Sequence, residues 1–201
     1  MKNYIKIGGV KIELTDEQAE KIKCNFCVGL KLSDVNVGET FKIGKYEFIV
    51  LEHSKETTAA ILKDLLYDCE IFGGHNNYVE SNVDKKCSEF GVIIANIIGE
   101  NNLIKHTVDL IADDGLKDYG KVIRNMSLIT AQLYRRYVEI LDKYKIDKWW
   151  WTATAHSTPK HGNKEWVKCV SPSGRLNRNI YDGNNGVRPF CILNSNIFVS
   201  K

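Results

Sequence analysis

The sequence of 201 residues has few features of a membrane protein, a secreted protein or a nucleic-acid-binding protein. Its longest largely apolar run, Val92–Ile98, is too short to cross a bilayer, so no membrane span is expected. Basic residues exceed acidic ones by only 28 to 25 and form no run, so we do not expect nucleic acid as a partner. The first ten residues show no secretory signal. We therefore expect cytoplasmic synthesis, and leave virion assembly or surface display open.

Catalytic and nucleotide-binding motifs are also missing. The chain has no P-loop, no G-x-G-x-x-G, no H-E-x-x-H and no G-x-S-x-G nucleophile elbow. Ser157, His156 and Asp182 could be combined into a triad, but any chain of this size contains such residues. We therefore expect a protein without catalytic residues, and not an enzyme.

The six cysteines lack the spacing of a metal site. Cys24 and Cys27 form the only C-x-x-C, and neither a second pair nor histidines follow at zinc-ligand spacing. We expect free thiols, with no metal and no other cofactor. The acidic loop Asp113–Gly120 offers carboxylate oxygens for calcium, but its spacing matches no EF-hand and a solvated turn is favoured.

The N-terminal part is expected to form a small unit of its own. Thr15 should cap a helix that runs to about Cys27, because acidic residues suit its first turn and a glutamine follows three positions later. A composition shift in Leu30–Gly38 suggests a boundary, with residues 1–37 as a hairpin and helix and residues 38–201 as the main domain. Alternating apolar residues predict two β-hairpins, Tyr4–Ile7 with Val10–Leu14 and Thr40–Ile43 with Tyr46–Leu51.

The main domain is expected to be α+β, with a small mixed or antiparallel sheet and two helices. Asn82–Ile98 carries apolar residues at helical spacing, with Ser81 as its N-cap and Gly99 at its end. Thr130 should cap a second helix that runs to Tyr144. The expected strands are Leu103–Ala112, Val122–Ile129, Trp149–Thr154, Val167–Ser171 and Gly186–Leu193. Thr57–Leu66 fits either a buried strand or a helix, and we favour a strand.

Two polar segments between the last three strands, Ala155–Trp166 and Arg175–Asn185, are expected to be loops that bind a ligand. They are rich in the residue types that recognition surfaces favour, although an ordinary polar loop has a similar composition. One tryptophan of the preceding strand is expected to border the ligand; the alternative is that all three pack in the core. The candidate ligand-binding residues are Trp150, Thr152, Thr154, His156, His161, Asn163, Trp166, Arg175, Asn177, Arg178, Asn179, Tyr181, Asp182, Asn184 and Asn185.

Three motifs in the last quarter of the chain resemble an uncharacterised domain family of gut Firmicutes and their prophages. They are Trp150–Thr154, Val167–Gly174 and Gly186–Pro189, moderately specific together and weak singly. That family is similar to the C-type-lectin fold, in the branch shared by formylglycine-generating enzymes and the variable proteins of diversity-generating retroelements.

The resemblance implies a C-type-lectin-like platform that recognises a protein or a glycan through loops before its final strand. In the retroelement proteins these loops are diversified at asparagine codons, and Arg175–Asn185 would suit that scheme. The chain lacks the Glu-Pro-Asn and Trp-Asn-Asp triplets of calcium-dependent lectins, which argues against calcium-bridged sugar binding. Arg188 and Pro189 are assigned to structure, the arginine as a hydrogen-bond donor that ties down the final strand.

Two alternatives remain open at this point. One is a thiol- or metal-dependent enzyme of the formylglycine-generating branch that uses Cys169 or Cys191, although both fall in predicted strands and suit a core. The other is a nucleic-acid-binding protein, which would use Trp150, Trp166, Arg175 and Arg178.

Overall fold

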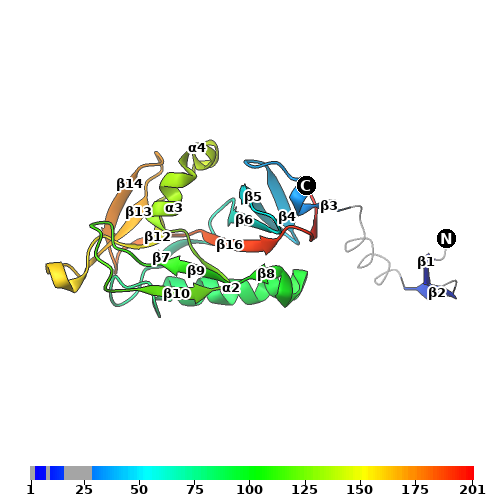
Figure 1. Ribbon diagram of the computed structural model, residues 1–201, viewed down its shortest axis with the longest axis horizontal. Coiled ribbons are helices and arrows are strands. Elements are labelled where there is room, and N and C mark those ends of the chain that lie inside the picture. Colours follow the sequence, from blue (N-terminus) through cyan, green and yellow to red (C-terminus); the bar gives the residue numbers. More distant parts are fainter. Residues whose placement is uncertain (1–2, 8–9, 16–28) are drawn as a thin grey trace.

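The computed structural model describes residues 3–7, 10–15 and 29–201. The helix predicted from Thr15 to Cys27 and the C-x-x-C pair lie outside the described residues. Within them the chain is a mixed α+β protein, mostly sheet with a few helices (Figure 1). The predicted N-terminal hairpin is confirmed: β1 (Asn3–Ile7) pairs antiparallel with β2 (Val10–Leu14).

The larger sheet has the order β11-β16-β6-β5-β4, with β8 also paired to β16. Both of its faces are buried, because alternate residues of the central strands point into two different cores. In β5, Phe48 belongs to one core and Ile49 to the other; β16 divides Cys191 and Phe190 in the same way. The predicted hairpin at residues 40–51 is confirmed. The strands are β4 (Thr40–Ile43), β5 (Tyr46–His53), β6 (Thr57–Leu62), β8 (Leu103–Ile104), β11 (Met126–Leu128) and β16 (Pro189–Asn194).

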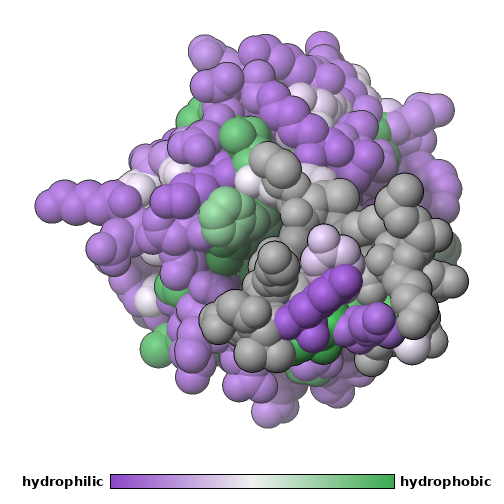
Figure 2. Space-filling view, turned by 90° about the vertical axis from the view of Figure 1, so that its right-hand side faces the viewer, coloured by the Kyte–Doolittle hydropathy of each residue, from purple (hydrophilic) through white to green (hydrophobic). Residues whose placement is uncertain are grey.

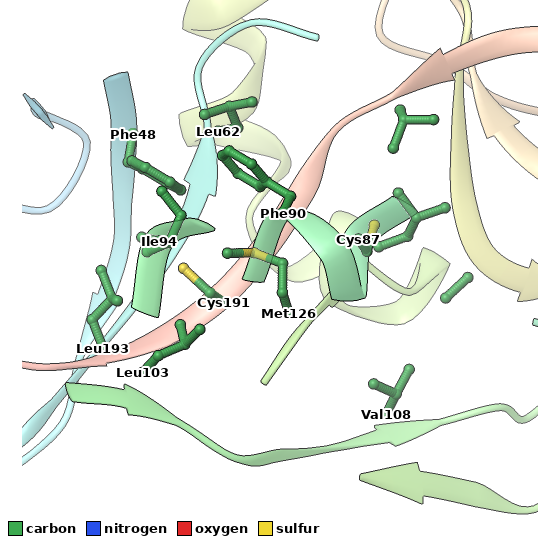
Figure 3. Close-up of a cluster of buried hydrophobic side chains, with 14 of the residues drawn as sticks. Phe48, Leu62, Cys87, Phe90, Ile94, Leu103, Val108, Met126, Cys191 and Leu193 are labelled. Carbon is green, nitrogen blue, oxygen red and sulfur yellow. The ribbon is translucent and has the colours of Figure 1, made fainter. Parts of the chain in front are cut away.

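Helix α2 (Asn82–Ile98) covers one face of this sheet and has the predicted bounds. The Ser81 side chain accepts a hydrogen bond from the Asp84 N–H, which caps the helix as expected, and Gly99 ends it with a φ of 88°. Its apolar stripe meets the strands in the first core, where Phe90 and Ile94 lie against Phe48 and Cys191 (Figure 3). The 3.6-residue period of the sequence is therefore the period of the buried face.

The opposite face is covered by α3 (Ala131–Arg136), α4 (Val138–Leu141) and the 3-10 turn η3 (Asp142–Tyr144). Thr130 caps α3 as predicted, but the single helix to Tyr144 is a wrong prediction. The helix breaks at Tyr137, whose φ and ψ are −107° and 14°. The Tyr137 ring packs in the second core while its hydroxyl donates to Glu52 of β5 at 2.5 Å, so tertiary contacts fix this residue outside helical geometry.

A second sheet has the order β14-β13-β12-β15-β7. The pairing of β12 with β15 is parallel, and the others are antiparallel. Strand β7 has no counterpart in the sequence prediction, because its residues are mostly exposed and show no apolar alternation. The strands are β7 (Tyr67–Ile71), β12 (Trp150–Ala155), β13 (Trp166–Val170), β14 (Leu176–Ile180) and β15 (Asn184–Val187).

Arg188 stands between the two sheets, after β15 and before β16. Its side chain is 1% exposed, and its Nε donates to the Leu62 carbonyl at 2.8 Å. One terminal nitrogen donates to the carbonyl of Lys63 at 2.7 Å and to that of Tyr144 at 3.4 Å. The expectation that Arg188 ties the final strand by hydrogen bonds is confirmed.

Two long predicted strands are each divided in two. Residues 103–112 form β8 and then β9 (His106–Asp109), and residues 122–129 form β10 (Lys121–Arg124) and then β11. The division arises because β8 and β11 pair with β16, whereas β9 and β10 leave that sheet and pair with each other. Periodicity alone cannot reveal a change of partner within a continuous apolar pattern.

Residues 30–37 pack with the main body. Strand β3 (Leu30–Lys31) pairs with β17 (Phe198–Val199), and the turn η1 (Leu32–Asp34) follows it. Leu32 and Val35 are both 0% exposed within the first core. Leu32 and Val35, which the sequence prediction places in the N-terminal unit, therefore contribute to the core of the main body. The remaining short turns are η2 (Glu100–Asn102) and η4 (Pro159–His161).

Candidate functional site

The hairpin of β13 and β14 carries the candidate site at the edge of the second sheet. Its register places Lys168 directly opposite Arg178 and Trp166 opposite Ile180, so these side chains share one face. Strand β14 is an edge strand, so Arg178 is exposed, while Lys168 lies inside the sheet and is buried. The sequence predicts one polar loop at Arg175–Asn185. That prediction is wrong, because β14 and the start of β15 occupy most of it.

The Arg178 guanidinium contacts both the Trp166 ring and the His156 imidazole. It lies over the Trp166 ring, 5.2 Å from the centroid, and Nη1 meets His156 Nε2 at 2.5 Å. A guanidinium can only donate, so Nε2 accepts and the imidazole carries its proton on Nδ1. Burial, together with the nearby charges of Arg178 and Lys168, lowers the pKa of His156 below its ordinary value of 6.5. The neutral imidazole that this favours is the form able to accept from Arg178.

The acidic loop after β9 supplies the carboxylates of the site. Asp113 accepts from Arg135 at 2.6 Å and from Lys168 at 3.0 Å, and lies 3.9 Å from His156 Nδ1. Burial acts to raise the pKa of Asp113, but the hydrogen bonds from Arg135 and Lys168 outweigh it and leave the pKa below 3.8. Asp113 is therefore an ionised link between α3 and β13 that lies close to the imidazole bonded to Arg178.

A second set of contacts fixes the segment that follows β12. Asp114 accepts from Ser157 at 2.5 Å and lies 3.1 Å from His161 Nδ1, and Asp118 accepts from Thr158 at 2.9 Å. The segment Ala155–Trp166 is thus a loop, as predicted, with a short 3-10 turn inside it. We call His156, His161, Trp166, Lys168 and Arg178, together with Asp113 and Asp114, the Arg178 surface.

Four of the predicted ligand-binding residues belong to this surface: His156, His161, Trp166 and Arg178. Asn163 braces the loop, because its side chain accepts from the backbone N–H groups of Glu165 and Trp166. Lys168, Asp113 and Asp114 were missed. Lys168 sits in an apolar strand pattern, and the acidic loop was interpreted as a solvated turn, since nothing local shows which cations it meets.

Three predicted residues of β12 are corrected to the core. Trp150, Thr152 and Thr154 are 2%, 0% and 3% exposed, because neighbouring strands and helices cover both faces of β12. The Thr152 hydroxyl donates to the Lys168 carbonyl, and Thr154 Oγ1 accepts from the Ala131 N–H. Of the three tryptophans only Trp149, just before the strand, is exposed. These threonines satisfy backbone groups instead of meeting a ligand.

The predicted asparagines of β14 cap the edge of the sheet. Arg178 and Ile180 direct their N–H groups away from β13, and the side-chain oxygens of Asn177 and Asn179 accept them, each at 2.9 Å. The Asn179 amide in turn donates to Asn185, which is 4% exposed and is therefore corrected to an interior position. Unpaired N–H groups on an edge strand can pair with a strand of another chain, and the asparagine side chains accept these N–H groups instead.

The remaining predicted residues lie away from the Arg178 surface. Arg175 is opposite Ser171 at the closed end of the hairpin, and the alternation of β14 directs it to the other face from Arg178. Tyr181 packs against the first core, and its backbone pairs with Glu165 and Phe72. Asp182 and Asn184 are exposed around the turn between β14 and β15.

The buried thiols differ from an activated nucleophile. Cys169 and Cys191 are both 0% exposed in the first core, as expected from their strands. Burial raises the pKa of Cys169 to about 12 and raises that of Cys191 further. An activated thiol needs a lowered pKa and access to substrate. In residues 3–7, 10–15 and 29–201, no three His, Cys, Asp or Glu side chains are grouped so as to hold a metal ion.

The larger hollows of the described chain lie elsewhere. One of about 860 Å³ runs between α2 and residues 123–126, and one of about 580 Å³ lies beside β17. None of the predicted ligand-binding residues lines either hollow. Figure 2 views the end of the molecule where β1 and β2 lie, and hydrophilic side chains dominate it with a few hydrophobic ones between.

Comparison with known proteins gives no family for this chain. No family model matches the sequence, and no curated protein matches it. In the part of the chain that the structure describes, no helix is long and apolar enough to cross a membrane.

Proposed function

We propose that this chain is a ligand-binding protein that recognises a protein or a glycan through the Arg178 surface. The observation that carries the proposal is the held position of Arg178. An exposed arginine normally moves freely, whereas this one rests on Trp166 and is bonded to His156, which Asp113 approaches in turn. Side chains that are ordered before the ligand arrives lose less entropy on binding. The surface therefore has a property that an ordinary polar loop lacks.

We further propose that the scaffold is C-type-lectin-like, of the kind found in the variable proteins of diversity-generating retroelements. Two features support this. The Gly186–Arg188 motif leads into β16, a central core strand, and β14 in the polar segment before it is an edge strand. The proposal gives no residue a catalytic role.

The diversification hypothesis makes a distinction between residues of the segment Arg175–Asn185. Asp182 and Asn184 are exposed and could vary freely, whereas Asn185 is interior and Asn177 and Asn179 cap N–H groups. If the locus is diversified, a near-copy template repeat should lie beside a reverse transcriptase gene. Variation should then concentrate at the exposed positions, and absence of the repeat would contradict the hypothesis.

The binding function is tested by screening a glycan array and a panel of purified surface proteins with the whole chain. Each hit is measured again with the double variant His156→Ala and Arg178→Ala, after its thermal unfolding has shown that it folds. We expect saturable binding that the double variant loses. Arg175→Ala, on the other face of the hairpin, is the matched control and should bind as the wild type does. Hits that the double variant retains would remove the Arg178 surface from the proposal.

A further inference from the structure

We propose that Arg178 binds a single anionic group, a carboxylate or sulfate, on an acidic glycan; this inference rests on the proposed function. Arg178 is exposed and donates to His156 from only one of its N–H groups. In the described part of the chain, the other donors of this guanidinium have no protein partner. A planar fork with free donors matches the geometry of a carboxylate or sulfate.

The neighbours of Arg178 fix the direction of that fork. Trp166 supports one face of the guanidinium, and His156 occupies one corner of it. The His156 ring lies between Arg178 and the Asp113 carboxylate, which is 3.9 Å from Nδ1 without a hydrogen bond to it and which two further cations keep ionised. Lys168, opposite Arg178 in the register, is buried and paired with Asp113, and so contributes electrostatic potential rather than a direct contact.

The charges around the surface suit one anion and not a polyanion. Asp113, Asp114 and Asp118 lie along the adjacent loop and hold Lys168, His161 and Thr158. A nucleic-acid backbone laid across Arg178 would bring further phosphates close to these carboxylates. Repulsion at that range is substantial in a partly buried setting. A ligand with one acidic group avoids it.

The composition of the surface favours a glycan over a protein. Protein interfaces are anchored by apolar or aromatic side chains that enter pockets at their centre. In residues 156–166 and 175–185 the exposed side chains other than that of Pro159 are polar or charged, and the aliphatic Leu176 and Ile180 are half-buried. Hydroxyl-rich sugars pair with such a surface through hydrogen bonds, and the acidic group supplies the ionic contact.

The experiment is a titration of the whole chain with small sugars, monitored by two-dimensional NMR. The probes are methyl β-glucuronide and glucose 6-sulfate, each compared with the neutral methyl β-glucoside. We expect the acidic sugars to bind at least about tenfold more tightly than the neutral one, because charge-assisted hydrogen bonds are the stronger kind. Arg178→Gln should abolish this preference, whereas Arg175→Gln should leave it unchanged. His156→Phe, which retains Arg178 but removes its acceptor, should reduce it several-fold.

Three outcomes would overturn the inference. The first is equal binding of acidic and neutral sugars, and the second is a preference that survives Arg178→Gln. The third is tighter, steeply salt-dependent binding of a single-stranded oligonucleotide or of an acidic peptide. Any of these, with array ligands still lost in the double variant, leaves the ligand-binding function standing. Absence of every ligand, on the array and here, would remove both proposals.

Discussion

Replacing Arg188 by methionine should lower the free energy of unfolding by about 2–4 kcal/mol. Methionine can fill much of the same space, so the change removes the guanidinium with little loss of packing. It leaves the carbonyls of Leu62 and Lys63 without the donors that now reach them at 2.8 Å and 2.7 Å. Hydrogen bonds from a charged group contribute about 1.5–3 kcal/mol each.

The cost of burying the Arg188 charge reduces the expected loss of stability. Burial lowers the pKa of Arg188 to about 10, which shows that the fold bears a cost for holding this charge away from water. Removal of the guanidinium relieves that cost, as it does when buried ion pairs are replaced by apolar residues. The guanidinium also lies 5.2 Å from the centroid of the Trp150 ring, and this favourable contact disappears too. The net estimate of about 2–4 kcal/mol combines the lost hydrogen bonds and ring contact with the relieved cost of burying the charge.

The change in the free energy of unfolding is measured by urea denaturation, monitored by tryptophan fluorescence. Arg175→Met, at an exposed position, is the control. The control should stay within about 0.5 kcal/mol of the wild type. Arg188→Lys should fall between the two, because one ammonium cannot reach both carbonyls along the directions of the fork. An Arg188→Met protein as stable as the control would refute the reasoning, since the two carbonyls would then need no donor.

Three further predictions concern other parts of the structure. Asp113→Asn should cost about 1–2 kcal/mol at neutral pH; because the folded pKa is below 3.8, this difference should shrink as the pH falls below about 4, and a pH-independent difference would contradict it. In a variant without the C-x-x-C pair, the exposed Cys69 should react quickly with a thiol reagent, while Cys87, Cys169 and Cys191 react only after denaturation. Rapid reaction of two thiols per folded chain would contradict the described burial. Replacing Asn177 and Asn179 together by valine should expose two N–H groups on β14 and cause concentration-dependent association in sedimentation experiments, whereas a strictly monomeric variant would show that the caps are dispensable.

Local patterns in the sequence were enough to predict the elements whose structure is set locally. Helix α2 was predicted to the residue, because its apolar spacing, its Ser81 cap and its Gly99 end all lie within the segment itself. A structural role for Arg188 could be predicted, because an arginine beside a proline in an apolar strand needs hydrogen-bond acceptors nearby. The break at Tyr137 could not be predicted, because its cause is a hydrogen bond to Glu52 from a distant strand.

The candidate site shows the same division. His156, His161, Trp166 and Arg178 could be predicted, since they belong to polar segments between strands. Their partners could not: Asp113 reaches Lys168 only because β9, α3 and β13 converge, and no local signal reports that. Strand β14 was mistaken for a loop because its asparagines and arginine lack apolar alternation, which an edge strand capped by its own side chains does not require.

The two adjacent tryptophans of β12 have a consequence for how the molecule responds to ligand. Trp150 points into the core under α3 and α4, and Trp151 into the core under α2. The same strand ends at Ala155, one residue before His156. A ligand that moves His156 therefore pulls on a strand anchored in both cores at once. The two indoles, one in each core, are natural fluorescent probes of that displacement.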